Sequence, residues 1–146
     1  MSWVEDDAAR RAAIAARPQA ALVSAELPLR ANLTVLENVA LVPQYHRDLH
    51  WAAASAEAMA LLEQLGYASC AGKRDATLTH EERFAAKLLR AVAAAPALVL
   101  IERPGYLLPD THYPPFVEAA LAGLRGRYGE CMVIDYAWNA PLYRPL

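Results

Sequence analysis

A short apolar run in the second half of the chain constrains the fold more than any other feature. Residues 97–101 are all apolar, and the run closes on the charged residue Glu102. A continuous apolar run of this length is typical of a strand that is buried on both faces within a parallel sheet. We therefore expect residues 97–102 to form a central parallel strand.

Other segments alternate between strand-like and helical patterns around this run. Short apolar runs at residues 20–24 and 131–135 predict two more strands. Helices are expected over residues 5–16, 35–41, 51–65, 79–95 and 114–125. This alternation predicts the α/β class, in which helices pack on a mostly parallel sheet. Because residues 44–95 are mostly helical, we expect residues 1–146 to form one domain with an inserted helical subdomain at roughly residues 44–95.

Two helix starts carry a clear capping signal. Thr34 is followed three residues later by Glu37, and Thr79 is followed in the same way by Glu82. In such a capping box, the threonine hydroxyl and the glutamate carboxylate each accept a hydrogen bond from a main-chain N–H at the start of the helix.

Composition and charge exclude several classes of function. The 146 residues have a net charge of −2 and contain no basic run, so a nucleic-acid partner is not expected. The longest apolar stretch, residues 91–101, is broken by Pro96 and is shorter than the roughly 20 residues that span a bilayer. The N-terminus carries no secretory signal. We expect a cytoplasmic protein without direct membrane insertion, which reaches the inner face of a membrane only peripherally, through a partner.

Cysteine and histidine residues give no firm metal or redox site. Cys70 and Cys131 form no CxxC pair, and we interpret them as free thiols in a reducing compartment, with a disulfide as the alternative. His46 and His50 are four residues apart, a spacing that on a helix can place two imidazoles on one zinc ion. No third ligand is obvious in the sequence, so exposed histidines are the preferred interpretation, and no metal or cofactor is expected.

Four segments, in order along the chain, resemble the nucleotide-binding domain of ABC transporters. Residues 32–41 (NLTVLENVAL) look like the LTVxENV stretch that follows the Q-loop in that family. Residues 78–83 (LTHEER) lie where the family has its LSGGE signature, and residues 96–104 (PALVLIERP) resemble its Walker B strand. Residues 129–135 (GECMVID) resemble the strand before the H-loop. The resemblance implies a partial P-loop-NTPase-like parallel sheet; the alternative is an unrelated α/β domain whose matches are coincidental.

The phosphate-binding loop of that family is not found. A P-loop requires the pattern GxxxxGK followed by Ser or Thr, so that main-chain N–H groups and a lysine hold the phosphates. None of the six glycines lies in such a pattern. Only about two dozen residues precede Ala25, which falls at the Q-loop glutamine, and the chain ends before the family's last strands. We therefore expect a truncated and degenerate ABC-ATPase domain from which the P-loop element is absent.

The signature segment keeps a helix start but not the glycines of the family. It consists of Leu78, Thr79, His80, Glu81 and Glu82. In the family this helix end faces the γ-phosphate of a partner's ATP, and glycines let the phosphate approach the positive end of the helix dipole. His80 and Glu81 place bulk and a carboxylate there. The resemblance thus implies a helix that survives as structure without its phosphate-binding role.

The Walker B segment and the loops after it are altered as well. Glu102 takes the place of the family's aspartate, and Arg103 takes the place of the catalytic glutamate. A carboxylate at position 102 can still bind a cation, but a guanidinium cannot act as the general base that activates water. Asp110 is displaced by one position from the D-loop aspartate, and Ala137 stands at the H-loop histidine. No catalytic residue is therefore expected.

An aromatic and polar segment follows Pro43, which we expect to end the preceding helix and to leave residues 44–50 irregular. In ABC proteins this region lies near the groove that receives the coupling helix of the permease. The resemblance therefore makes a candidate partner surface of Gln44, Tyr45, His46 and Trp51. The alternative is a loop that packs on its own subdomain.

The pattern of strands and helices is kept, whereas the catalytic positions are altered. This combination predicts a pseudo-ATPase: a catalytically inactive ABC-ATPase-like protein that is a structural or regulatory partner of an ABC transporter. Its expected partners are a membrane permease or a full ABC ATPase, and a homodimer is a further way to cover a reduced sheet. Two other functions stay open: a stand-alone interaction domain unrelated to transport, and a composite-site nucleotide-binding subunit whose partner supplies the P-loop. Near the C-terminus, Tyr136, Trp138 and Tyr143 either cover a sheet edge or form a binding patch.

Overall fold

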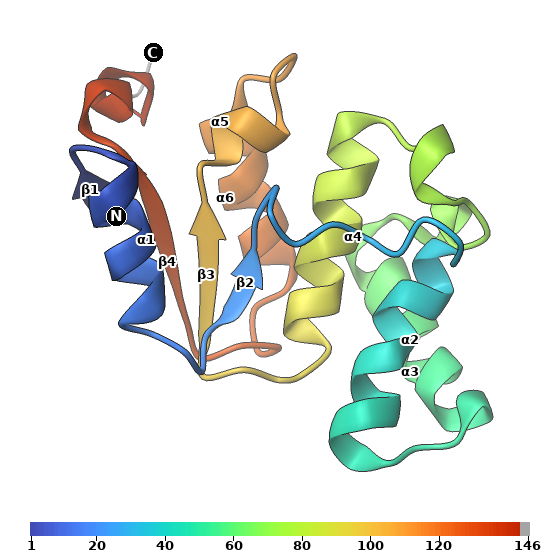
Figure 1. Ribbon diagram of the computed structural model, residues 1–146. Coiled ribbons are helices and arrows are strands. Elements are labelled where there is room, and N and C mark those ends of the chain that lie inside the picture. The colour runs from blue at the N-terminus through green and yellow to red at the C-terminus, as the bar shows by residue number, and fades with distance from the viewer. Residues whose placement is uncertain (144–146) are drawn as a thin grey trace.

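A four-stranded parallel sheet forms the centre of the computed structural model, which describes residues 1–143 (Figure 1). Its strands are β1 (Ser2–Val4), β2 (Ala21–Val23), β3 (Leu98–Glu102) and β4 (Glu130–Tyr136). Their order across the sheet is β1-β4-β3-β2, and each neighbouring pair is parallel. β3 lies between two strands and is buried along most of its length. The α/β class and the central parallel strand that the apolar run predicts are confirmed.

Helices pack on both faces of this sheet and also form a group beside it. The helices of the described chain are α1 (Asp7–Ala15), α2 (Val35–Arg47), α3 (Trp51–Leu65), α4 (His80–Val92), α5 (Pro104–Leu107) and α6 (Tyr113–Gly123). Figure 1 shows α1 against one face and α6 against the other, while α2, α3 and α4 gather beyond the edge formed by β2. None of the helices within residues 1–143 combines the length and the apolar character that crossing a bilayer requires.

The pleat of β3 divides the core into two parts. Val99 and Ile101 belong to the larger cluster, which includes buried residues of α2, α3, α4 and α6. Leu100 points to the opposite face and joins a smaller cluster with Val4 and Ile134, packed against α1. Successive residues of a strand point to opposite faces, so a strand that is apolar throughout needs a core on both sides.

Both predicted capping boxes are present. The Thr34 hydroxyl accepts a hydrogen bond from the Glu37 N–H at 3.1 Å, and the Glu37 carboxylate accepts one from the Thr34 N–H at 3.0 Å. Thr79 and Glu82 make the same pair of bonds at the start of α4, at 3.1 and 2.9 Å. The hydrogen bond from the main-chain N–H of the capping threonine holds the pKa of each glutamate below its ordinary value.

The expected end of the first capped helix is wrong. The helix does not stop at Pro43 but continues to Arg47, so residues 44–47 are helical. Proline lacks only its own N–H, so one hydrogen bond is lost while the residues after it still donate to earlier carbonyls. Pro43 is buried, which adds core packing at the position, and Asp48 ends the helix in a left-handed conformation with φ of 53°.

β1 has no counterpart among the strands that the sequence predicts. Three residues are too few to show an alternating pattern, and β1 becomes a strand because it pairs with β4, with Ser2 in register with Ile134. At this edge of the sheet Tyr143 packs edge-on against Trp3, with ring centroids 5.2 Å apart. This contact agrees with the edge-covering role that was one of two roles expected for the C-terminal aromatic residues.

Candidate functional site

The carboxyl ends of parallel strands are where the ligands of open α/β sheets bind. In this protein β1 ends at Val4, and Glu5 and Asp6 connect it directly to α1. Asp6 caps that helix, because its Oδ1 accepts a hydrogen bond from the Ala9 N–H at 2.8 Å. A strand, a turn and a helix therefore meet at this edge of the sheet. The turn is short and acidic, and it is not a glycine-rich loop of the kind that wraps a phosphate.

A buried ion pair closes the end of β3. Glu102 lies on the same face of the strand as Leu100, toward α1, and Arg10 and Glu102 are only 2% and 1% exposed. The Nη1 of Arg10 donates to Oε1 of Glu102 at 2.7 Å. The Nη2 of the same guanidinium donates to Glu26 at 3.3 Å, and its Nε lies 3.6 Å from Asp7. A buried carboxylate is stable only when it is paired and hydrogen-bonded, and Arg10 provides both.

Arg103 brings a second guanidinium to the same carboxylate. Its Nε donates to Oε1 of Glu102 at 3.0 Å, and its Nη2 lies 3.9 Å from Glu26. The residue has a left-handed backbone with φ of 47°, and its guanidinium carbon lies 5.0 Å from the ring centre of Tyr106. The position that the family resemblance assigns to a catalytic carboxylate therefore holds a cation whose charge is already paired.

Acidic side chains of the protein itself surround the N-terminus of α4. Glu81 accepts a hydrogen bond from the Thr111 hydroxyl at 3.0 Å, and Nε2 of His80 lies 4.0 Å from a carboxylate oxygen of Asp110. Glu82 turns back to the capping threonine. Carboxylates complement the positive end of the helix dipole, so this helix end is already supplied with negative charge. A phosphate group brought to it would meet carboxylates of like charge.

The two predicted degenerate segments stay apart in the described part of the chain. Within residues 1–143, no hydrogen bond or ion pair joins residues 78–82 to Glu102 or Arg103. Leu78 belongs to the larger core, and Thr79 serves as the helix cap. The structure brings Glu102 and Arg103 together, as their adjacency in sequence requires, but it adds Arg10, Glu26 and the rest of the ion network, which the sequence does not indicate.

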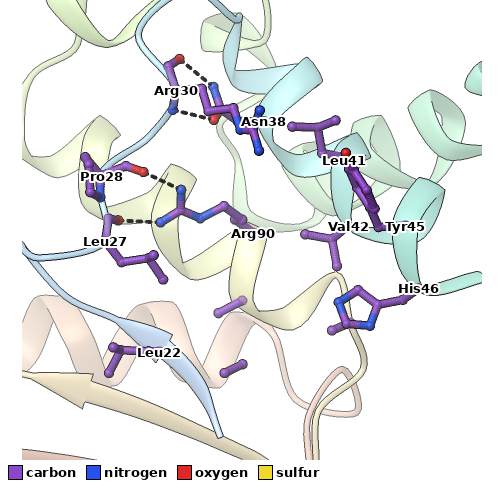
Figure 2. Close-up of a pocket in the computed structure, with 13 residues that line it drawn as sticks. Leu22, Leu27, Pro28, Arg30, Asn38, Leu41, Val42, Tyr45, His46 and Arg90 are labelled. Atoms are coloured by element: carbon purple, nitrogen blue, oxygen red, sulfur yellow. Dashed lines mark hydrogen bonds between the residues drawn. The ribbon is translucent and has the colours of Figure 1, made fainter. Parts of the chain in front are cut away.

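A groove of about 450 Å³ opens between α2, α4 and the segment that follows β2 (Figure 2). Most of its wall is apolar, and Leu22, Leu27 and Val42 contribute to it. Of the four residues predicted as a partner surface, Tyr45 and His46 line this groove, and Tyr45 is 78% exposed. Gln44 is half-buried and Trp51 is exposed, and both lie outside the lining. The structure thus brings two of the four predicted residues to a concave surface.

The positive charges beside this groove lack acidic partners. Figure 2 shows the Arg90 guanidinium donating to the carbonyl oxygens of Leu27 and Pro28, at 2.5 and 2.7 Å. Lys87, one turn earlier on α4, is 4% exposed, and its Nζ donates to the carbonyl of Ser24 at 3.1 Å. Within residues 1–143 neither cation forms an ion pair with a carboxylate. Burial lowers the pKa of both side chains.

The sequence gives a weak signal for these α4 cations and none for Arg10. Lys87 stands between Ala86 and Leu88 on a helix that is otherwise apolar on its inner face, which marks it as a residue whose charge must be satisfied within the fold. Arg10 and Glu102 are 92 positions apart, and each alone looks like an ordinary surface charge. Only the pairing of strands and helices joins them.

The histidine and cysteine residues lie in separate places. His46 lines the groove, whereas His50 precedes the first turn of α3. Within residues 1–143 no three His, Cys, Asp or Glu side chains converge in a way that would hold a metal ion. Cys70 and Cys131 are both free, and burial raises the pKa of both thiols, that of Cys131 to about 11.

Comparison with known proteins places the fold. No protein-family model matches the chain, and no curated protein sequence matches it. Among 94 solved chains that do match in structure is the ATP-binding cassette MJ0796, in a dimeric post-hydrolysis state bound to ADP and Pi. The two chains share 21% sequence identity with a TM-score of 0.65, and the match covers 92% of this chain and 58% of that one. The chain therefore has an ABC-ATPase-like fold, a partial P-loop-NTPase-like sheet with its helices, and spans 58% of the length of that cassette.

Proposed function

We propose that this protein is a catalytically inactive ABC-ATPase-like protein that acts as a structural or regulatory partner of an ABC transporter. The observation that carries the proposal is the contact of 2.7 Å between the buried Arg10 guanidinium and Glu102. In P-loop NTPases a carboxylate at the end of this strand holds the magnesium ion of the nucleotide. Here that carboxylate is occupied by an arginine of the same chain, and Arg103 stands beside it.

Two further features support the loss of nucleotide chemistry. No GxxxxGK pattern followed by Ser or Thr occurs in the 146 residues. The N-terminus of α4 is surrounded by Glu81, Glu82 and Asp110, so it is a poor place for the phosphate of a partner's nucleotide. This second feature weighs against the composite-site alternative, in which the partner would supply the P-loop and this chain would supply the helix end.

The groove supports the partner role. Apolar walls, the exposed Tyr45 ring and the unpaired charge of Arg90 are features of a surface that another molecule covers. Because the fold resembles that of an ABC ATPase, we propose that a membrane permease or a full ABC ATPase covers it, and that the protein works in the cytoplasm at the inner face of the membrane. A homodimer is the second candidate; the matched cassette MJ0796 is itself described as a dimer.

Nucleotide titration tests the loss of chemistry. We expect isothermal titration of the pure chain with Mg-ATP to show no binding, both alone and with a candidate ATPase partner, and phosphate release to stay at the background rate. Binding that depends on His80 or Glu81 would instead establish the composite-site function. Light scattering on the pure chain decides between a monomer and a homodimer.

Co-purification from the native host at native abundance tests the partner role. We expect a transporter permease or a complete ABC ATPase to be recovered with the tagged chain. Replacing Tyr45 by Ala should reduce that recovery, because the ring lines the groove. The matched control is Tyr106→Ala, an exposed tyrosine at the carboxyl end of the sheet, which should leave recovery unchanged. Recovery of the chain without any transporter component would contradict the proposal and favour a stand-alone interaction domain.

A further inference from the structure

One wall of the groove is formed by β2, the strand at the edge of the sheet. Ala21 and Leu22 of this strand line the groove, and Figure 2 shows Leu22 on the side opposite Val42 and His46 of α2. Within residues 1–143 β2 pairs with β3 alone, and its main chain makes no other hydrogen bond. An edge strand leaves unpaired the N–H and C=O groups that point away from its neighbour. The groove therefore holds open main-chain donors and acceptors beside its apolar side chains.

Short side chains leave room in front of this edge. Besides Arg90, the residues of α4 that line the groove are Ala91 and Ala94, and β2 begins with Ala21. Each alanine carries only a methyl group, so the main chain of β2 is not screened by long side chains at these positions. The groove of about 450 Å³ is thus a space in which a peptide segment can lie next to the strand.

The charge-bearing side chains of the lining are all basic. They are Arg30, His46 and Arg90, and within residues 1–143 no Asp or Glu lines the groove. Arg30 is exposed, and neither arginine forms an ion pair with a carboxylate in the described chain. Complementary charge steers association and selects among partners. The lining therefore favours a segment that carries carboxylate side chains.

The open strand edge distinguishes an extended occupant from a helical one. A helix satisfies its own main-chain hydrogen bonds, so it would use the apolar walls and the charges but leave β2 unpaired. An extended segment would pair with β2 as a further strand, and its side chains would alternate between two sides. Because β2 has only three residues, this pairing is short, and the apolar walls and the arginines must supply much of the affinity.

We propose that the groove receives an extended, acidic segment of the partner, which adds as a strand to the outer edge of β2. Carboxylates of this segment pair with Arg30 and Arg90, and its apolar side chains pack on Leu22 and Val42. The proposal rests on the partner role of the groove, and it names the conformation and the charge of what the partner brings. Binding in this way extends the parallel sheet by one strand beyond β2.

Synthetic peptides titrated into the pure chain test the proposal by nuclear magnetic resonance. The main probe is an end-blocked peptide of about six residues, the usual length of a strand, that alternates valine and glutamate. One comparison peptide has lysine in place of glutamate, and another has methyl groups on its main-chain nitrogens. A third has the composition of the main probe but is held as a helix by a covalent side-chain link.

We expect the main probe to bind at millimolar concentration or below and to slow hydrogen exchange at the amides of residues 21–23. The lysine and N-methylated peptides should bind at least about tenfold more weakly, because the first reverses the charge and the second cannot donate to β2. Arg30→Gln should weaken binding of the main probe by at least about threefold. The matched control is Arg125→Gln, an exposed arginine outside the groove, which should leave binding unchanged.

The inference is wrong if the main probe does not bind, if its N-methylated form binds equally well, or if the helical peptide binds more tightly than the extended one. Co-purification tests the partner role separately. Recovery of a transporter component together with failure of the main probe would leave the proposed function in place and overturn strand addition. Binding of the main probe without recovery of a transporter component would retain strand addition and overturn the proposed function.

Discussion

At the carboxyl end of the sheet the buried guanidinium of Arg10 lies against three carboxylates, whereas beside the groove Arg90 meets main-chain carbonyls and, within residues 1–143, no carboxylate. Lys87 repeats the second arrangement, with one carbonyl as its partner. In the first region, positive and negative side chains of the same chain pair with one another. The second has left positive charge without a counter-ion next to apolar walls.

This difference separates a region whose charges are paired inside the fold from a region where we propose that a partner binds. A charge paired inside the fold has little left to offer a ligand, because its hydrogen bonds and its field are already used. A charge that meets only carbonyl dipoles keeps its attraction for an anionic group, and apolar surface beside it adds binding energy. Four predictions test this contrast, from the largest expected effect to the smallest.

The largest effect is expected when the closed pair is broken. Arg10→Ala leaves Glu102 buried without its main counter-ion, so the free energy of unfolding in urea should fall by about 3–5 kcal/mol. In Arg10→Met with Glu102→Leu most of the loss should be recovered, because both charges are gone. A loss below about 1 kcal/mol for the single variant would show that Arg10 and Glu102 do not form a buried ion pair.

Removal of the Arg90 charge should lower the free energy of unfolding by less. Arg90→Ala deletes charge-assisted hydrogen bonds to Leu27 and Pro28 but leaves no buried carboxylate behind, so we expect a loss of about 1.5–3 kcal/mol in the same measurement. Hydrogen exchange should quicken in the segment that holds these carbonyls. Arg90→Lys is the matched control and should retain part of both effects. A loss as large as that of Arg10→Ala would erase the distinction between the regions.

The two capping threonines give a matched pair at the starts of the two helices that line the groove. Thr34 starts α2 beside the groove and Thr79 starts α4, with nearly equal hydrogen-bond lengths in the two boxes. Each change to Ala should lower the free energy of unfolding by about 1 kcal/mol, and Ser in the same position should restore most of it. Losses that differ by much more than this would show that one helix end has a role besides its cap.

The smallest effect is expected in the dependence of stability on acidic pH. The pKa of Glu82 is held down first by the hydrogen bond from the Thr79 N–H and then by the contact with Lys73. A carboxyl group with a lowered pKa in the folded state adds stability above its unfolded value of about 4.3, and this stability is lost as the pH falls through the lower folded value. Glu82→Gln should therefore weaken the dependence of the urea midpoint between about pH 6 and pH 3. An unchanged dependence would mean that other carboxylates set it.

Sequence reasoning succeeds where a few neighbouring residues decide the outcome. The run that ends at Glu102 becomes the central strand, and the boxes at Thr34 and Thr79 form with both hydrogen bonds. It fails at Pro43, where the rule that proline ends a helix does not hold. The helix continues because proline removes only one hydrogen bond and the buried ring adds packing. It also fails at β1, which is a strand only because β4 is available to pair with it.

The candidate sites divide in the same way. Tyr45 and His46 follow from a family resemblance carried by a nearby segment, and they do line a groove. The charges that give the groove its character come from α4, more than 40 residues further along the chain. The local pattern gives only a weak signal for them, since a basic residue on a helix is usually exposed.

By itself the sequence determined the strands and helices with strong local signals, the helix caps, and the lack of a P-loop pattern, because each of these is a property of a short stretch of residues. Only the tertiary structure decided that Arg10 would pair with Glu102, across 92 positions, and that Arg90 would donate to carbonyls 62 and 63 positions away and to no carboxylate within residues 1–143. The physical reason is that the state of a charge depends on burial and on its partners, and both are set when strands and helices pack.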